Sequence, residues 1–432
     1  MISKVIDAKF VLKLLIINRS KMSGVHAYRN ALYALDKAGR VRIWRQTLFV
    51  GAVDENDKNV NLVIESGLVD GKLTRKDKKI KARGKKDPEQ VGLMEANKNV
   101  KDKLNKEGYK THDMLVQRAH DVNYPYALPD KIYTIMDKLV EYPTNENWHP
   151  LPMLAKKVDD KKIAGPLMIQ RKYDGVRCLS TIDDAGRVIM VSRGGLYYQI
   201  PHIAEDLIRI FTQHDLHGKG IWLDGELYKH GIPFADISGA ARTARSGGDL
   251  FEEKKSFLEY HVYDLLDTTN LFMPFRDRYY YLDQYVPSAS SGSKTRLVET
   301  YAVRGMDDVK PYHEQFVEEG YEGTIIRYGD GVYEPGYRSV SLLKYKNFFE
   351  GEFTIVGMEY DPNDISTFRF LLETEDGQTF GCRPVGTHDL WQEYADNYLT
   401  KCDGKLATVR YLNLSVNGLP EKANVKAIRD YE

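Results

Sequence analysis

The 432-residue chain has only three cysteines, and none of them forms a CxxC pair. Because Cys178, Cys382 and Cys402 lie far apart, a four-cysteine zinc module is excluded and a disulfide framework is disfavoured. No apolar run approaches the ~20 residues that span a membrane. Lys plus Arg equals Asp plus Glu, at 62 each, so the net charge identifies no partner. We expect a monomer in a reducing, intracellular compartment, since the chain also lacks a coiled-coil pattern.

The first residues contain a short apolar stretch that does not resemble a secretory signal. The run "FVLKLLII" is broken by Lys13, and no small-residue cleavage site follows it. Met22 begins "MSGVHAYRNALYALD", which is typical of a natural start. We therefore expect residues 1–21 to be an upstream extension.

The length predicts two or three domains, and the composition changes along the chain suggest where they divide. Residues 28–120 alternate apolar and polar side chains around the turns "DKAG" and "VDGK", which predicts a small antiparallel sheet followed by a helix. Prolines in residues 121–148 indicate a linker region around one predicted helix, "KIYTIMDKLVE". Residues 149–348 mix short strands with few helices, and residues 349–432 are strand-rich, as in a small barrel. The predicted class is α+β.

A basic strip, Gly71 to Lys86, follows the first predicted sheet strands. It holds nine Lys or Arg residues against one Asp. Such a run is either a solvated surface or a surface that contacts phosphates, where each neutralised phosphate releases counterions. The sequence leaves both interpretations open.

The central segment places charged residues inside short apolar strands. In "WLDGELY", Asp224 and Glu226 share one face, because residues two apart in a strand point the same way. Buried charges are costly unless they are paired or bind a ligand or metal. Each could instead be a surface position, but together they predict a pocket for a polyanion and a metal ion. These inward charges are Lys172, Glu226, Glu322, Lys344 and Lys346.

The residue types in this pocket suggest a covalent reaction at phosphorus. A lysine amine is a good nucleophile when neutral, and nearby cations such as Arg177 and Lys344 favour the neutral form. The same cations stabilise charge on a phosphoryl group under attack. Glu322 suits Mg²⁺, and Tyr263 offers a face on which a base can stack. We therefore predict that Lys172 attacks a nucleoside triphosphate and forms a covalent lysine–nucleotide intermediate.

The motif "KYDGVR" resembles the K-x-D-G-x-R of the covalent nucleotidyltransferases, and within them the ATP-dependent DNA ligases. The resemblance implies that Lys172 becomes adenylylated, with Asp174 and Arg177 as its acidic and basic partners. It also implies an adenylation domain over 149–348 and an OB-fold over 349–432. ATP and Mg²⁺ are the implied cofactors, with Mn²⁺ as a substitute, and nicked duplex DNA is the implied partner.

Other motifs, in the family's order, imply further roles. Gln170 would read the adenine edge, Tyr263 would stack on adenine, and Arg193 would contact the nucleotide or the nick phosphate. The last motif, "EKANVKAIRDYE", departs from the family by lacking its opening Arg and Pro. The implied catalytic set is Lys172, Asp174, Arg177, Lys344 and Lys346. The implied nucleotide contacts are Gln170, Arg193, Glu226, Tyr263, Arg327, Lys344, Lys346 and Arg429, and the implied metal ligands are Glu226 and Glu322.

The N-terminal segment resembles, more loosely, the first domain of certain phage and viral ligases, which is akin to a WGR domain. The stretches "LYALDKAGRVRIW" and "SGLVDGKLTRKDKKIKARGK" carry this likeness. It implies an accessory DNA-binding module whose basic strip contacts the duplex backbone. A viral or phage enzyme would work in the host cytoplasm, and a nuclear location stays open.

Two other classes share part of this pattern. An RNA ligase or an mRNA-capping guanylyltransferase would use the same lysine chemistry, but the WGR-like module and "PMLAKK" disfavour them. A catalytically dead nucleic-acid-binding scaffold is disfavoured because every charged motif residue is present. An NAD-dependent ligase is disfavoured by the lack of zinc-type cysteine spacing.

Overall fold

The structure is a computed structural model of the chain, and its described residues form two compact units. One unit lies within residues 1–80 and 92–345, and the other within 81–91 and 346–432. The structure describes residues 20–22, 25–52, 58–82, 86–158, 163, 165–243, 253–288, 292–361, 364–415 and 417–429. The predicted extension at residues 1–21 therefore lies almost wholly outside the described residues.

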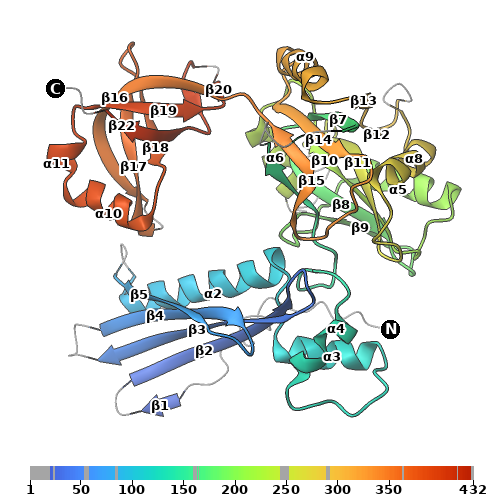
Figure 1. Cartoon of the computed structure of the whole chain (residues 1–432), viewed down its shortest axis with the longest axis horizontal. Coiled ribbons are helices and arrows are strands. Elements are labelled where there is room, and N and C mark those ends of the chain that lie inside the picture. Colours follow the sequence, from blue (N-terminus) through green and yellow to red (C-terminus); the bar gives the residue numbers. More distant parts are fainter. Residues whose placement is uncertain are drawn as a thin grey trace. The chain divides into compact units, whose positions relative to one another are not determined.

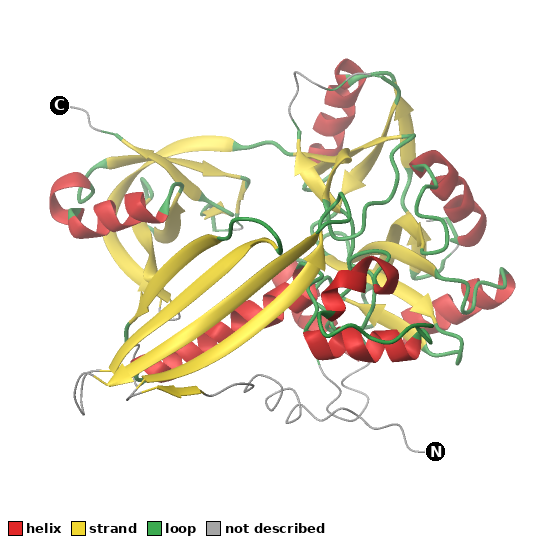
Figure 2. Ribbon diagram, turned by 60° about the horizontal axis from the view of Figure 1, so that its bottom comes forward, coloured by secondary structure: helices red, strands yellow, loops and turns green. Residues whose placement is uncertain are grey.

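The N-terminal part is a five-stranded antiparallel sheet in sequential order, as the alternating pattern predicted. The side chain of Asp36 closes the hairpin between residues 35 and 41 by accepting hydrogen bonds from the backbone N–H of Ala38 and Arg40. Helix α2, Pro88–Lys106, crosses one face of this sheet (Figure 2), where Gln46 donates to the carbonyl of Ala96 at 2.8 Å. The strands are β1 (Ser20–Met22), β2 (Val25–Leu35), β3 (Val41–Ala52), β4 (Lys58–Leu68) and β5 (Thr74–Ile80).

The segment expected to be a linker is folded and partly buried. Helix α3, His112–Asp121, begins at Thr111, whose hydroxyl accepts from the N–H of Met114. The 3₁₀ helix η1 (Ile132–Ile135) and the short helix α4 (Met136–Leu139) pack against α3, and buried apolar side chains of all three elements form one cluster. Because apolar residues at 132, 136 and 139 enter this core, the prolines of the segment shape turns rather than an extended connection.

His149, which follows this segment, gives the unit a built-in sensitivity to acid. Its ring packs against Tyr197 and Trp222, and burial lowers the pKa of His149 to about 4. The unfolded chain takes up this proton near pH 6.5, so between pH 6.5 and pH 4 the unfolded state binds more protons and stability falls as the pH falls. From pH 7 to pH 5 the unfolding free energy should fall by about 2 kcal/mol more in the wild type than in His149→Phe, which has no imidazole to protonate.

Urea unfolding at the two pH values measures this difference. His120→Phe, at an exposed position on α3, is the matched control. Parallel pH responses of wild type and His149→Phe would contradict the prediction.

Two five-stranded sheets form the centre of the first unit. The first has the order β12-β11-β10-β8-β9, and the second has the order β13-β7-β14-β15-β6. The first sheet comprises β8 (Val176–Ile182), β9 (Val188–Val191), β10 (Ile221–Tyr228), β11 (Glu259–Asp267) and β12 (Thr295–Leu297). The second comprises β6 (Leu154–Lys157), β7 (Leu167–Lys172), β13 (Thr300–Val303), β14 (Gly323–Tyr328) and β15 (Arg338–Tyr345).

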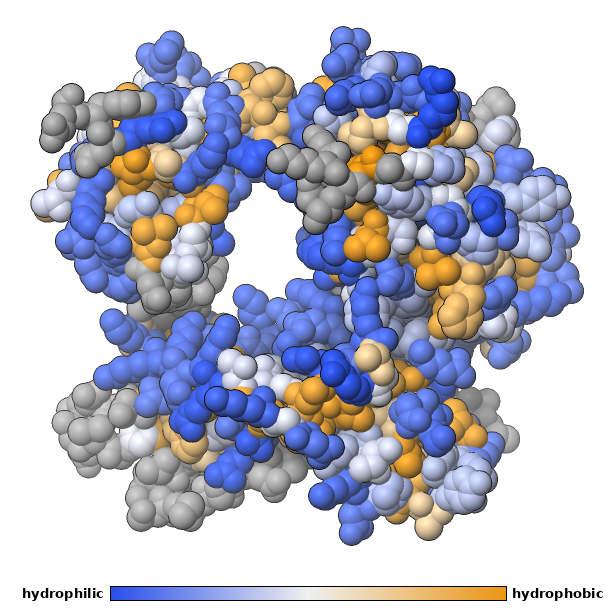
Figure 3. Space-filling view, viewed as in Figure 1, coloured by the Kyte–Doolittle hydropathy of each residue, from blue (hydrophilic) through white to orange (hydrophobic). Residues whose placement is uncertain are grey.

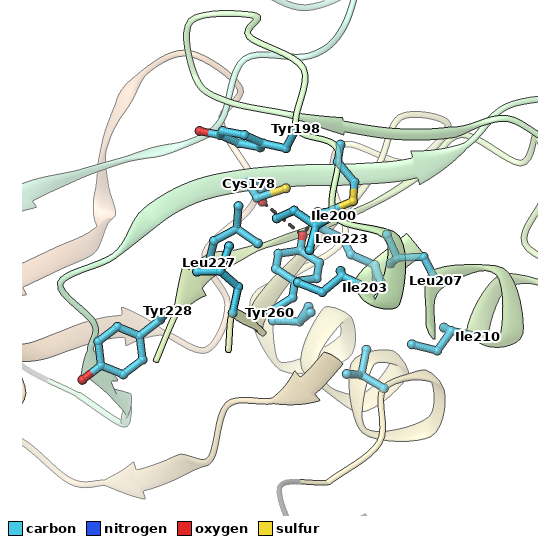
Figure 4. Packing of buried hydrophobic residues seen from close by; sticks show 14 of the residues in the cluster. Cys178, Tyr198, Ile200, Ile203, Leu207, Ile210, Leu223, Leu227, Tyr228 and Tyr260 are labelled. Carbon is cyan, nitrogen blue, oxygen red and sulfur yellow. Dashed lines mark hydrogen bonds between the residues drawn. The ribbon is translucent and has the colours of Figure 1, made fainter. Parts of the chain in front are cut away.

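Apolar layers join these sheets to each other and to helices. Leu179 and Leu266 of the first sheet pack with Leu342 of the second. Helices α5 (Pro201–Gln213) and α6 (Phe234–Arg242) cover the other face of the first sheet, and α9 (Met306–Glu318) covers that of the second. Helix α8 (Phe275–Tyr285) lies against β11. Figure 4 shows the core beneath α5, where the Tyr260 hydroxyl donates to the carbonyl of Cys178 at 3.1 Å.

The second unit contains the closed barrel that the strand-rich C-terminal pattern predicted (Figure 1). Its strands close in the order β16-β17-β18-β22-β19, and β18 pairs with β22 in parallel. Two helices, α10 (His388–Asp396) and α11 (Tyr398–Lys401), connect β18 to β19. The barrel strands are β16 (Phe349–Asp361), β17 (Asp364–Glu373), β18 (Thr379–Pro384), β19 (Leu406–Tyr411) and β22 (Asn424–Ile428), and a small ribbon pairs β20 (Asn413–Leu414) with β21 (Pro420–Glu421).

Within the described ranges, none of the helices combines the length and the apolar character needed to cross a membrane.

Candidate active site

Lys172 is the last residue of β7. Its ammonium donates to the carboxylate of Glu322, and the N–H of Glu322 donates to the carbonyl of Lys172 at 2.9 Å. The Glu322 side chain is 5% exposed, whereas that of Lys172 is 20% exposed. A buried carboxylate therefore holds the predicted nucleophile at an accessible edge.

The turn after Lys172 explains why the motif contains a glycine. A Cβ at Gly175 would lie 2.3 Å from the carbonyl oxygen of Leu227, so only glycine lets this turn pass beside β10. The neighbouring Asp174 lies in the same turn, between β7 and β8. The glycine of "KYDG" is thus required by close packing against β10, independently of any chemical role of the motif.

Strand β15 adds a second lysine to the same face of the second sheet. Lys344 pairs with Ile325 of β14, which in turn pairs with Gln170, two residues before the nucleophile. Burial lowers the pKa of Lys344, and the positive charges of Arg338 and Lys172 add to this effect. The structure therefore brings Lys172, Glu322 and Lys344 together, as predicted. Lys346 follows the end of β15 and belongs to the second unit.

Arg177 and Asp224 form a buried ion pair on the first sheet. The guanidinium of Arg177 donates to both carboxylate oxygens of Asp224, and to the carbonyl of Met153 at 3.1 Å. The hydroxyl of Tyr333 donates to the same carboxylate at 2.6 Å. Because Asp224 is fully buried, these bonds compensate its charge and fix the orientation of Arg177.

A β-bulge aims Tyr263 into the site. Asp224 pairs with Asp264, but the next residue, Gly225, pairs with Val262, so Tyr263 is left without a partner. Its hydroxyl donates to Glu226 at 3.1 Å, and the guanidinium of Arg177 lies 5.1 Å from its ring centre. The predicted base-stacking residue therefore stands beside the predicted ribose-binding or metal-binding carboxylate.

Burial raises the pKa of Glu226 to about 7, although the positive charges of Lys172 and Arg177 oppose the rise. Glu226 lies directly opposite Arg177 in the pairing of β10 with β8. Its carboxyl group consequently changes charge near neutral pH. A cation that enters the site would favour the ionised form.

Gln170 and Arg327 form a polar joint between the two sheets. The amide of Gln170 donates to the carbonyl of Tyr263 at 3.1 Å and to the hydroxyl of Thr300 at 2.9 Å, and its oxygen accepts from Arg327 at 2.9 Å. Arg327 also pairs with Asp264, which accepts from Arg278 as well. The side chains of Gln170, Arg327, Asp264 and Arg278 are buried. In this structure Gln170 and Arg327 therefore brace Tyr263. Their predicted contacts with the nucleotide stay predictions.

Arg193 and Arg338 are two further positive side chains that lie near the cations of the site, which are Lys172, Lys344 and Arg177. Arg193 is exposed on a turn after β9, and partial burial together with the charges of Arg338 and Arg177 lowers its pKa. Sequence reasoning missed Arg338, which also acts on Lys344. Strand periodicity gave no signal for it, because the pairing of β15 with β6 shifts register between Ser339 and Leu343 and interrupts the alternation between Arg338 and Lys344.

The remaining predictions are less directly placed. Arg429 lies in the second unit, where its Nε donates to Glu352 at 3.1 Å, so the structure does not relate it to Lys172. Among the residues that the structure describes, no three His, Cys, Asp or Glu side chains gather as a metal cluster. Glu226 and Glu322 therefore stay predicted metal ligands.

Comparison with known proteins agrees with this geometry. Residues 152–346 match the family described as ATP dependent DNA ligase domain. A DNA ligase of African swine fever virus (strain Badajoz 1971 Vero-adapted) is 28% identical over 306 residues, which cover 66% of this chain and 70% of that protein. The DNA ligase of Enterobacteria phage T4 is 28% identical over 269 residues, covering 52% of this chain and 54% of that protein.

Solved structures share the fold. One titled Pmar-Lig_Pre is 23% identical and superposes with a TM-score of 0.55, covering 71% of this chain and 73% of its own. A structure of the Lig E DNA ligases is 17% identical with a TM-score of 0.51, covering 65% of this chain and 99% of its own. At these identities the likeness concerns the fold.

Proposed function

Residues 152–346 match the ATP-dependent DNA ligase domain family, and we infer that the chain is an ATP-dependent DNA ligase. We propose that it seals nicks in three steps. Lys172 Nζ attacks the α-phosphate of ATP, forms an N–P bond and releases pyrophosphate. The AMP then passes to the 5′-phosphate at a nick in duplex DNA. The 3′-hydroxyl attacks that phosphate, seals the strand and releases AMP.

The pairing of Lys172 with Glu322 is the observation that carries this proposal. The carboxylate holds the amine at the strand end and is its nearest proton acceptor when the amine attacks. Lys344, Arg177 and the neighbouring Arg338 place positive charge where the phosphates would lie. Tyr263 and Glu226 supply a ring face and a carboxyl group for the adenosine.

The donors present also fit a magnesium ion. Mg²⁺ commonly takes one or two carboxylates together with phosphate oxygens and water, which matches a site built on Glu322 and Glu226. When bound there, the ion would neutralise phosphate charge. Lys346 and Arg429 are proposed to complete the phosphate contacts from the second unit.

We assign the closed barrel to the OB-fold on its strand order, its parallel β18–β22 pair and its helices between β18 and β19. We propose the divisions 28–120 for a WGR-like DNA-binding domain, 121–148 for the connection, 149–348 for the adenylation domain and 349–432 for the OB-fold. The described cysteines are free and buried, which supports a reducing, intracellular compartment. Nicked duplex DNA is the proposed partner of a monomer.

A pulse–chase experiment tests the reaction. The protein is incubated with Mg²⁺ and ATP labelled on the α-phosphate, and then chased with a nicked DNA duplex. Label that appears on the protein and leaves as sealed DNA accumulates supports the proposal. Label that moves only with nicked RNA would favour an RNA ligase, label taken only from GTP would favour a capping enzyme, and no label from either would indicate a dead scaffold.

The basic strip is expected to supply sequence-independent affinity for DNA. Its described lysines Lys76, Lys79 and Lys81 are exposed, and hydrophilic side chains cover much of the adjacent α2 on the face seen in Figure 3. Each phosphate contact contributes about 0.9 to the slope of log K against log salt. We expect the triple change of these lysines to Gln to weaken binding and to reduce that slope by about 3.

Fluorescence anisotropy with labelled nicked duplex at several salt concentrations measures the slope. A triple variant at exposed lysines of α2, Lys98, Lys101 and Lys106, controls for the loss of net charge. An unchanged slope in the strip variant would mean that the strip is only a solvated surface.

A further inference from the structure

The turn that carries Arg193 rests against the N-terminal part of the chain. Gly195 adopts φ +78°, and a Cβ added there would lie 3.2 Å from Asn145 Nδ2 and 3.6 Å from Asn105 Oδ1. The turn is closed internally by Ser192, whose hydroxyl accepts from the N–H of Leu196 at 2.9 Å. The turn is thus a small preformed unit, and a side chain added at Gly195 would meet two buried asparagines.

Both asparagines are held by further hydrogen bonds. Asn105, near the end of α2 and 2% exposed, donates to the carboxylate of Glu146 at 3.1 Å and accepts from the N–H of Glu146 at 3.2 Å. The side-chain oxygen of Asn145 accepts from the N–H groups of Asn147 and His149 at 2.9 and 3.1 Å. These hydrogen bonds therefore fix the orientation of both asparagine side chains beside Gly195.

Lys110 ties this surface to the N-terminal sheet. Its buried ammonium donates to the carbonyls of Thr144 and Asn145 at 2.7 and 2.6 Å, and it lies 4.8 Å from the ring centre of Trp148. The backbone of Lys110 exchanges two hydrogen bonds with Tyr33 of β2. Hydrogen bonds hence link β2 to Asn145 and α2 to Glu146, and Asn145 lies next to the Arg193 turn at Gly195.

The charged neighbours of Arg193 differ in part from those of Lys344. Arg338 and Arg177 act on Arg193, and Glu107 at the end of α2 is the acidic group that opposes them. Lys344, by contrast, is acted on by Lys172 as well as by Arg338. Arg193 and Lys344 therefore share Arg338 as a positive neighbour, and Arg193 in addition feels the opposing charge of Glu107.

We propose that Asn105 and Lys110 are positioning residues for the AMP-transfer step, because they hold the Arg193 turn where its guanidinium meets the 5′-phosphate of the nick. The N-terminal region is then part of the site that acts on the nick, in addition to any tethering by its basic strip. This inference rests on the proposed ligase function. It concerns a phosphate monoester at a DNA end rather than the α-phosphate of ATP.

Asn105→Ala in the full chain tests the proposal in single-turnover experiments. Self-adenylylation with labelled ATP should stay within about twofold of wild type, whereas transfer of AMP from adenylylated protein to saturating nicked DNA should slow about tenfold to a hundredfold. In an Arg193→Ala background, Asn105→Ala should cause no further loss, because the group that it positions is absent. Asn97→Ala, exposed on the same helix, is the matched control.

Equal losses in both steps, or a full additional loss in the Arg193→Ala background, would overturn the inference. Unchanged transfer in Asn105→Ala would overturn it as well. If Asn105→Ala does not fold, Gly195→Ala applies the same test from the other side, since its added Cβ meets Asn145. Failure of the wild-type protein to accept label or to seal DNA would instead overturn the proposed function.

Discussion

Lys172→Arg is expected to lower labelling of the protein by α-labelled ATP at least about a thousandfold. Arginine keeps the positive charge that pairs with the buried Glu322, but its guanidinium stays protonated and is not a nucleophile. The loss would therefore come from chemistry rather than from an unpaired carboxylate. Denaturing gels of the labelled protein measure the effect, and Lys172→Ala should give the same result.

Two controls separate the nucleophile from the rest of the site. Lys219→Arg, at an exposed lysine paired with Asp215, should label like wild type. A nick that already carries AMP on its 5′-phosphate should still be sealed by Lys172→Arg, because that step forms no bond to the lysine. Robust labelling of Lys172→Arg would refute the assignment of the nucleophile.

Arg327→Met is expected to destabilise the first unit by about 3–5 kcal/mol. Arg327 is almost fully buried and joins β14 of the second sheet to Asp264 on β11 of the first. Its removal leaves Gln170 without a donor and leaves Asp264 with only Arg278 as a cationic partner. A buried carboxylate with part of its compensation removed is costly.

Urea unfolding, with the first unit followed by tryptophan fluorescence, measures this loss. Arg304→Met is the matched control, because the Arg304 side chain is 93% exposed and its pair with Asp308 should contribute less than about 1 kcal/mol. If Arg327→Met keeps wild-type stability but loses affinity for ATP, then Arg327 contacts the nucleotide, as the sequence resemblance implied. The two roles thus predict different measurements.

Short-range patterns account for what the sequence predicted well. Period-two alternation identified the N-terminal sheet, since side chains on alternate sides of a strand meet different environments. Short strands between turn signals indicated the C-terminal barrel. Period-two alternation also placed Asp224 and Glu226 on one face, and the close approach at Gly175 is written into the "KYDG" motif. The segment at 121–148 was harder, because its prolines suggested a linker while its spaced apolar residues form a small core.

Other features depend on residues that are distant in the chain. Tyr263 enters the site through a bulge, which depends on how β10 pairs with β11 and not on local propensity. Gln170 bonds to Tyr263, Thr300 and Arg327 because β7, β11, β13 and β14 lie close together. The effect of Arg338 on Lys344 and Arg193 likewise depends on the folded chain.

The sequence by itself therefore predicted the chemistry: a lysine nucleophile, its carboxylates and the cations for phosphate, each within a short motif of a strand. Tertiary structure alone decided which of these groups lie close together and which of them bond to one another. It also decided that Asn105 of α2 lies under the Arg193 turn, 88 residues before Arg193 in the chain. The physical reason is that hydrogen-bond partners of buried polar groups are chosen by packing, and packing joins segments whose separation along the chain carries no local signal.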